Sequence, residues 1–258
     1  MKRSSFIIWL NVALAVGTIV MNILANALPL NGQNTGEISD RFKVLFVPAG
    51  YVFSIWGLIY IGILAYAVYQ ALPGQRENPR LARVDSLFIV ASVANVAWLF
   101  FWHYNLFLLT LVAMLTLLAS LIGIYLALGI GRGVVPAGER WAVRVPFSIY
   151  LGWVSVATIA NVTDVLDFVG WNGWGLEPAA WAAIMLGIGV VLAALVAFTR
   201  HDVAYVLVFV WAYIGIALKQ ASTPLLPMIA WPAVVVLVIL VVVAAMGEQR
   251  RLREATGK

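Results

Sequence analysis

The sequence predicts an all-α fold, a polytopic membrane bundle of about eight transmembrane helices. Of its 258 residues, 64% are hydrophobic and only 10% are charged, whereas soluble domains carry about 25% charged residues. A folded chain of this length exposes roughly a quarter of the surface that it exposes when unfolded, so water could not accommodate this much apolar surface. The apolar runs are too long for barrel strands and do not alternate with polar residues. We therefore expect a multi-pass integral membrane protein whose surroundings are the lipid bilayer.

Eight apolar stretches meet or approach the length of about 20 residues that a membrane-spanning helix needs. The seventh is the shortest, and a tight turn at residues 103–105 separates the third from the fourth. The stretches cover residues 5–28, 47–70, 84–104, 106–129, 145–165, 179–198, 203–219 and 225–246. The polar, turn-rich segment 29–46 is the longest loop on its side. A lid over a site and a plain connector are equally compatible with its composition.

Basic residues fall mainly on one side of these stretches. If the N-terminus is cytoplasmic, 13 of the 16 Lys and Arg residues lie on the cytoplasmic side, and Arg41, Lys43 and Lys219 lie on the other. Short cytoplasmic loops are enriched in Lys and Arg, so we predict a cytoplasmic (inner) membrane location with both termini in the cytoplasm. We attribute the net charge of +5 to topology and anionic lipid rather than to nucleic acid. The 13 residues are Lys2, Arg3, Arg76, Arg80, Arg83, Arg132, Arg140, Arg144, Arg200, Arg250, Arg251, Arg253 and Lys258.

The first stretch has some features of a secretory signal. A basic pair at residues 2–3 precedes an apolar run, and an Ala-x-Ala site follows at residues 25–27. However, the run from 6 to 24 is longer than the usual signal core of about 7–15 residues. It also contains Asn11 and Asn22, which suit a packed helix, so we expect the helix to be retained.

Catalytic and metal chemistry have little support in the sequence. The chain has no cysteine, which excludes disulfides, thiolate catalysis and iron–sulfur clusters. We expect His103 and His201 near opposite membrane faces, so they could not bind one iron together, and we expect His103 at the interface. Asp164 and Asp167 could in principle form an acid–base pair, but we expect both to be solvated at the interface. We therefore predict no catalytic or metal site and no required cofactor.

Three of the stretches each carry a face of aromatic and polar residues at helical spacing. Such faces would point inward, because an Asn amide facing lipid lacks a partner, and together they would form an aromatic-walled cleft of the kind that binds small molecules. On spacing alone, ordinary helix packing with hydrogen-bonded Asn residues is the favoured interpretation. The candidates are Trp56 and Tyr60 in the second stretch, Asn95 and Trp98 in the third, and Tyr150, Trp153 and Asn161 in the fifth.

Three segments resemble a known family. Residues 51–60 (YVFSIWGLIY), 95–101 (NVAWLFF) and 150–153 (YLGW), with Asn161 eight residues after the last Trp, are similar to the second, third and fifth helices of the TspO/MBR family, the tryptophan-rich sensory and translocator proteins. The resemblance covers roughly residues 5–165. Ser54 and Ile55 replace the family's proline pair, and residues 162–164 lack the Tyr and Arg of its cholesterol-recognition segment.

The resemblance implies a five-helix bundle whose pocket opens toward one membrane face and contains the seven candidates above. It also implies a sensor or carrier for a large apolar ligand such as a porphyrin-like tetrapyrrole or another lipid-like molecule, and homodimerisation. A membrane enzyme that modifies such a ligand and a secondary transporter are the alternatives. We expect residues 1–170 to form the five-helix core, and residues 171–258 to add three helices and a basic cytoplasmic tail.

Overall fold

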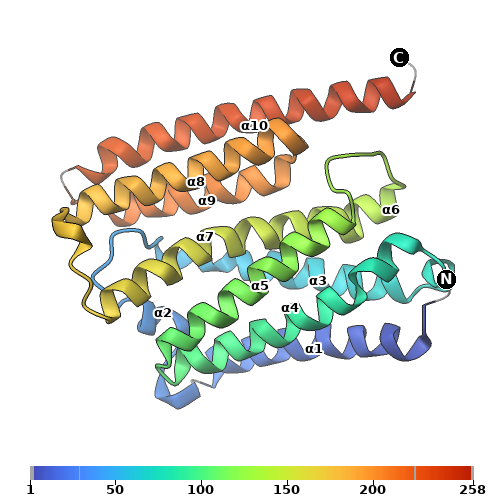
Figure 1. Cartoon of the computed structure of the whole chain (residues 1–258), viewed down its shortest axis with the longest axis horizontal. Helices are drawn as coiled ribbons and strands as arrows, with labels where there is room; N and C mark the ends of the chain where they lie inside the picture. The colour runs from blue at the N-terminus through green and yellow to red at the C-terminus, as the bar shows by residue number, and fades with distance from the viewer. Residues whose placement is uncertain (1–2, 29, 224, 257–258) are drawn as a thin grey trace.

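Within the residues that the structure describes, the eight apolar stretches fold into eight long helices. The computed structural model describes residues 3–28, 30–223 and 225–256, and this part of the chain is helical with no strand (Figure 1). Two short helices, α2 (Thr35–Ser39) and α6 (Ala137–Glu139), lie in the connections. The all-α prediction is therefore confirmed. The long helices are α1 (Ser5–Ala27), α3 (Ile55–Ala71), α4 (Pro79–His103), α5 (Phe107–Ala127), α7 (Val145–Phe168), α8 (Pro178–Arg200), α9 (Val203–Lys219) and α10 (Leu226–Thr256).

These helices have the length and composition of membrane spans. Among the described residues, seven helical stretches are long and apolar enough to cross a bilayer. The eighth, α9, is apolar but has only 17 residues, which corresponds to about 25 Å of helix. It is the stretch that the sequence marks as shortest. The chain is thus an integral, multi-pass membrane protein.

Two helices extend well beyond the apolar runs that predict them. α4 begins at Pro79 rather than at residue 84, because Asn78 caps the helix and proline suits its first turn. α10 continues to Thr256 through a charged segment. Hydropathy marks the part of a helix that lies in lipid, whereas capping and helix propensity determine where the helix ends.

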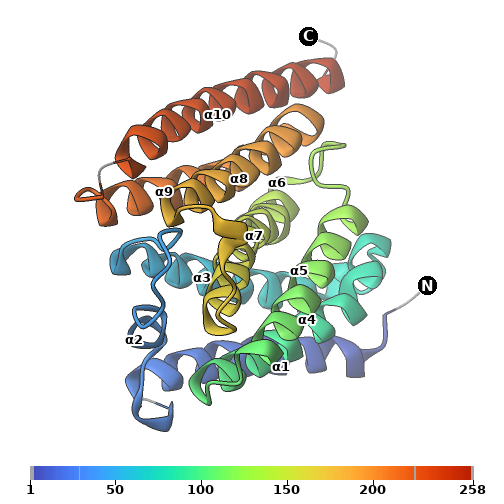
Figure 2. The same cartoon turned by 60° about the vertical axis from the view of Figure 1, so that its left-hand side comes forward.

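α7 lies at the centre of the bundle. Most of its residues are buried, and it contacts α3, α5 and α9. The views of Figures 1 and 2 agree that α1, α4 and α5 lie on one side of α7 and that α8, α9 and α10 form a layer on the other. The last three helices therefore pack directly onto the first five.

Both chain ends lie at one end of the bundle, which we call the terminal face; the opposite end is the far face (Figure 1). The alternating helix directions place Arg41, Lys43 and Lys219 at the far face. The other basic residues that the structure describes lie at the terminal face, namely Arg3, Arg76, Arg80, Arg83, Arg132, Arg140, Arg144, Arg200, Arg250, Arg251 and Arg253. Lys2 and Lys258 lie outside the described residues. In the folded bundle, most of the described Lys and Arg residues therefore lie at the terminal face.

The segment between α1 and α3 folds over the far face. Asn34 and Glu37 form a reciprocal capping box at the start of α2. Ile38 and Phe46 are fully buried, and Ile38 packs with Trp102 of α4. The segment is therefore anchored to the bundle.

One expectation about a polar residue was wrong. Asp164 is only 4% exposed, because α7 runs one turn past residue 165 and Asp164 lies three residues from the buried Asn161, on the same side of the helix. His103 lies in the last turn of α4 at the far face, where its side chain is completely buried and its Nδ1 lies 2.8 Å from the carbonyl oxygen of Leu99. Asp167 is exposed, as expected.

Candidate functional site

A cavity of about 610 Å³ lies in the far-face half of the bundle, between α1, α3 and α4. Residues at the start of α2 cover it, so the segment 30–49 contributes to its wall. The cavity is lined by Asn22, Ile23, Asn26, Ala27, Asn34, Thr35, Gly36, Gly50, Phe53, Trp56, Tyr60, Trp98 and Leu99. Three of the seven predicted residues, Trp56, Tyr60 and Trp98, thus meet in one cavity.

The α3 side of the cavity is aromatic. The rings of Trp56 and Tyr60 stack at a centroid distance of 5.7 Å and an interplanar angle of 25°. Their spacing of four residues places them on one face of α3. Phe53 reaches the same wall from the 3₁₀ turn Gly50–Ser54 that precedes the helix. This arrangement presents broad π surfaces to the cavity.

A second stacked pair supports the α4 side. Trp98 stacks on Trp102 at a centroid distance of 5.3 Å and an interplanar angle of 18°. The Trp98 indole Nε1 donates to Asn161 Oδ1 at 3.4 Å, and the Trp102 Nε1 donates to the carbonyl oxygen of Thr35 at 3.2 Å. The second bond ties the covering segment to α4, so the cover and the wall are held together.

α1 supplies the polar side of the cavity. Asn22 Nδ2 donates to Asn95 Oδ1 and to the carbonyl oxygen of Thr18, both at 2.8 Å. Asn26 Nδ2 donates to the carbonyl oxygen of Asn22 at 2.9 Å. α1 is not among the helices that the aromatic spacing and the family resemblance predict for the site. The Asn22 and Asn26 amides within an apolar run were the signal available for doing so.

The other four predicted residues lie one layer behind the cavity wall. Asn95 Nδ2 donates to the hydroxyl of Tyr150 at 2.9 Å. The Trp153 ring packs edge-on against Trp56, with centroids 6.2 Å apart. Asn161 Nδ2 donates to Thr110 Oγ1 at 2.9 Å. Three of these residues contact lining side chains directly, because Asn95 bonds to Asn22, Asn161 bonds to Trp98, and Trp153 packs on Trp56.

The cavity is suited to binding rather than to acid–base chemistry. Its lining residues, in the part of the chain that the structure describes, carry amides, a hydroxyl, a phenol and indoles but no carboxylate, imidazole or amine. His103 does not line it. No group of three or more His, Asp or Glu side chains among the described residues could hold a metal ion. A flat apolar molecule with a few hydrogen-bonding groups matches this lining.

The comparison with known families now adds to this geometry. A family model described as "TSPO-like protein" matches residues 8–246. The chain belongs to the TSPO-like protein family. The resemblance drawn from the Trp-containing segments is thereby confirmed. No curated protein and no solved structure matched the chain.

Membership of the TSPO-like family supports a membrane ligand-binding or sensor protein at the level of the family. The match includes α8, α9 and most of α10, and so continues past residues 5–165, on which the sequence resemblance was based. The last three helices therefore belong to the matched family region.

Proposed function

We propose that this TSPO-like protein is a membrane-embedded sensor or carrier that binds a large apolar small molecule, of the porphyrin-like tetrapyrrole class, in the cavity between α1, α3 and α4. The observation that carries the proposal is the stacked pair Trp56–Tyr60, which lies in the same cavity as Trp98 and the Asn22 amide. A macrocycle offers two flat apolar faces that stack well on such rings.

The size and polarity of the cavity support this ligand class. A volume of about 610 Å³ falls within the range of about 300–1,000 Å³ typical of small-molecule sites. The Asn22, Asn26 and Asn34 amides can bond to polar substituents at the edge of a ring. Stacking and hydrogen bonding hold the ligand in this proposal, and no metal ligation is involved.

Porphyrin titration tests the proposal. Protoporphyrin added to the purified full-length protein should bind saturably, as measured by the shift of the porphyrin absorbance band. Replacing Trp56 or Trp98 with Leu removes a stacking surface worth about 1 kcal/mol or more, so each variant should weaken binding at least about fivefold. Trp9→Leu is the matched control, because Trp9 is 62% exposed and does not line the cavity. Equal affinities for all three variants would show that porphyrin binds elsewhere.

A second measurement separates binding from turnover. Among the described residues that line the cavity there is no carboxylate, imidazole or amine, so porphyrin incubated with the protein in light and air should be recovered unchanged, apart from the loss seen without protein. Chromatography of the pigment measures this directly. A new pigment that accumulates with the wild-type protein but not with Trp56→Leu would replace the sensor or carrier proposal with an enzymatic one.

A further inference from the structure

A second cavity, of about 660 Å³, lies on the other side of α3 from the first. It runs between α3, α7 and α9 and reaches the C-terminal part of α10, near the terminal face. Along α9 it extends from Val203 to Trp211, which is about 12 Å of helix. We call it the terminal groove.

The walls of the terminal groove are apolar and open toward the lipid. Ile55 and Leu58 of α3 face Leu207 and Trp211 of α9 across it, with Ile149 of α7 also in the lining. Leu58 is 52% exposed and Leu207 is 47% exposed. In a membrane-spanning bundle, such side chains at the rim contact acyl chains, so the groove is continuous with the hydrocarbon phase.

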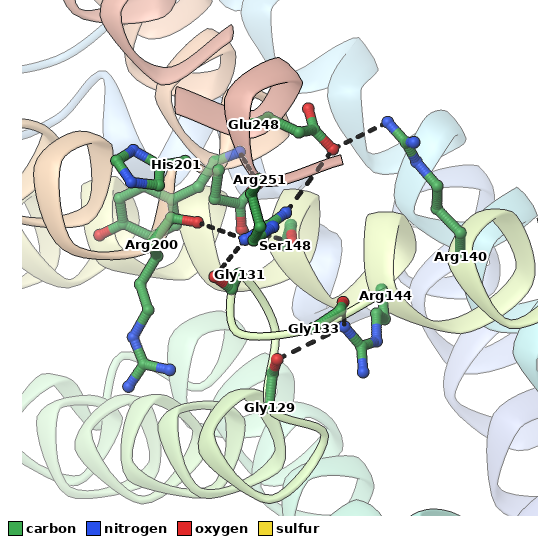
Figure 3. A network of polar contacts seen from close by, with 12 residues as sticks. Gly129, Gly131, Gly133, Arg140, Arg144, Ser148, Arg200, His201, Glu248 and Arg251 are labelled. Carbon is green, nitrogen blue, oxygen red and sulfur yellow. Dashed lines mark hydrogen bonds and ion pairs between the residues drawn. The ribbon is translucent and has the colours of Figure 1, made fainter. Parts of the chain in front are cut away.

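The end of the groove at the terminal face is basic. Arg140 precedes α7, Arg144 lies one turn later, and Arg251 reaches in from α10 (Figure 3). Arg144 is largely committed, because its Nη1 donates to the carbonyl oxygen of Gly133 at 2.8 Å and its side chain is only 10% exposed. Arg251 Nη1 also donates to the carbonyl oxygens of Gly131 and Arg200, which leaves its other nitrogens to face the groove. Arg140 and Arg251 remain 38% and 23% exposed.

The two carboxylates in the lining leave this end positive. Glu248 accepts a bond from Arg140 at 2.8 Å and lies 4.0 Å from Arg251 (Figure 3). Asp202 accepts from Ser148 Oγ at 2.6 Å and from the Tyr125 hydroxyl at 2.9 Å, and burial raises the pKa of its carboxyl. Because Asp202 is engaged internally, Glu248 is the lining carboxylate paired with the two partly exposed guanidinium groups of Arg140 and Arg251.

We propose that the terminal groove binds an anionic phospholipid, with its phosphate between Arg140 and Arg251 and one acyl chain along α3 and α9. Guanidinium groups bind phosphate oxygens through charge-assisted bonds, and basic pockets between transmembrane helices are suited to anionic headgroups. The lateral opening and the apolar walls favour a lipid over a soluble phosphate. This inference does not depend on the ligand of the first cavity.

Native mass spectrometry of the full-length protein can test the groove. The protein is released from micelles that contain equal amounts of phosphatidylglycerol and phosphatidylcholine, and we expect it to retain phosphatidylglycerol preferentially. Arg140→Gln should lower phosphatidylglycerol retention about fivefold. Arg250→Gln is the matched control, because Arg250 is 84% exposed and lies outside the groove. Equal retention of the two lipids, or equal losses for the two variants, would overturn the proposal.

Two further substitutions distinguish the contribution of the headgroup contacts from that of the acyl-chain contacts. Glu248→Gln removes the carboxylate that competes for the arginines and should increase phosphatidylglycerol retention, whereas Glu254→Gln, with an exposed side chain outside the groove, should not. Ala204→Phe fills the groove and should lower retention of both lipids. If that variant does not fold, Leu207→Trp at the exposed rim serves the same purpose. Loss of bound lipid to equimolar glycerophosphate would show a soluble-anion site instead.

Discussion

At the scale of single residues, Asn95 is the side chain that joins the helices around the cavity. It is 2% exposed, accepts a bond from Asn22 of α1 and donates one to Tyr150 of α7. An amide inside a membrane bundle has no water to replace a lost partner. The position of the Asn22 amide in the cavity wall therefore depends on residues that do not themselves line it.

Replacing Asn95 with Ala should destabilise the protein by about 0.6–2 kcal/mol, the usual range for hydrogen bonds between transmembrane helices. Tyr150→Phe removes the same bond from the other partner, so the double variant should lose less than the two single losses combined. The test is to measure the free energy of unfolding of the two single variants and the double variant in mixed micelles. Strict additivity would show that the Asn95–Tyr150 bond contributes nothing.

Part of the cavity could be predicted from residue spacing together with the family resemblance. Spacing of three or four positions placed Trp56, Tyr60 and Trp98 on shared helix faces, and the resemblance to the TspO/MBR family made those faces pocket candidates rather than ordinary packing. The same rule selected Trp153, which supports the wall from behind, since spacing shows the face of a helix but not what lies between that face and a cavity. Asn22 was missed as a lining residue because a pair of amides gives no aromatic pattern.

At the scale of secondary-structure elements, a buried ion pair connects Arg3, which precedes the N-cap of α1, to Asp85 of α4. Arg3 Nε donates to Asp85 Oδ2 at 2.8 Å, and Arg3 also donates to Gln70 of α3. Both charged residues are at most 5% exposed. These contacts tie the start of α1 to both α3 and α4.

Asp85→Ala should destabilise the protein by about 3–5 kcal/mol, because it leaves the Arg3 guanidinium buried without its counter-charge. Asp167→Ala is the control, since Asp167 is an exposed carboxylate on α7, and it should change stability by no more than about 0.5 kcal/mol. Thermal unfolding in detergent compares the two. Similar melting temperatures for both variants would mean that the ion pair adds no net stability.

Two glycines on α8 give a test of how α8 packs on α9. A Cβ at Gly189 would overlap the hydroxyl oxygen of Tyr213, which donates to the carbonyl oxygen of Leu186 at 2.8 Å. A Cβ at Gly187 would meet nothing within 4 Å. Gly189→Ala should therefore destabilise by about 1–3 kcal/mol, whereas Gly187→Ala should be neutral or stabilise by up to about 1 kcal/mol. Chemical unfolding gives the free energy of unfolding of both variants. A Gly189→Ala protein as stable as the wild type would contradict the close packing of α8 on Tyr213.

The number of helices could be predicted from hydropathy. The residues where helices end, and the helices that pack against one another, could not. The eight apolar runs predicted the eight long helices, because each must satisfy its backbone hydrogen bonds within lipid. Hydropathy could not show that α10 continues to Thr256 or that Asp164 is buried. Those facts depend on neighbouring helices, which an apolar pattern does not specify.

At the scale of the whole molecule, the placement of charge determines the expected orientation. The terminal face carries most of the described basic residues, whereas the far face carries Arg41, Lys43 and Lys219. From the positive-inside rule we expect the terminal face to lie in the cytoplasm. In this orientation the aromatic cavity is in the outer half of the membrane and the terminal groove opens on the inner side.

Cysteine labelling can test this orientation, because the natural sequence has no cysteine. Glu77 is exposed at the terminal face before α4, and Glu177 is exposed at the far face before α8. Glu177→Cys should react with a membrane-impermeant maleimide in intact cells, whereas Glu77→Cys should react only after permeabilisation. The two variants change charge equally and serve as controls for each other. The reverse pattern would place the terminal face and the groove arginines outside, and the aromatic cavity would then lie in the cytoplasmic half of the membrane.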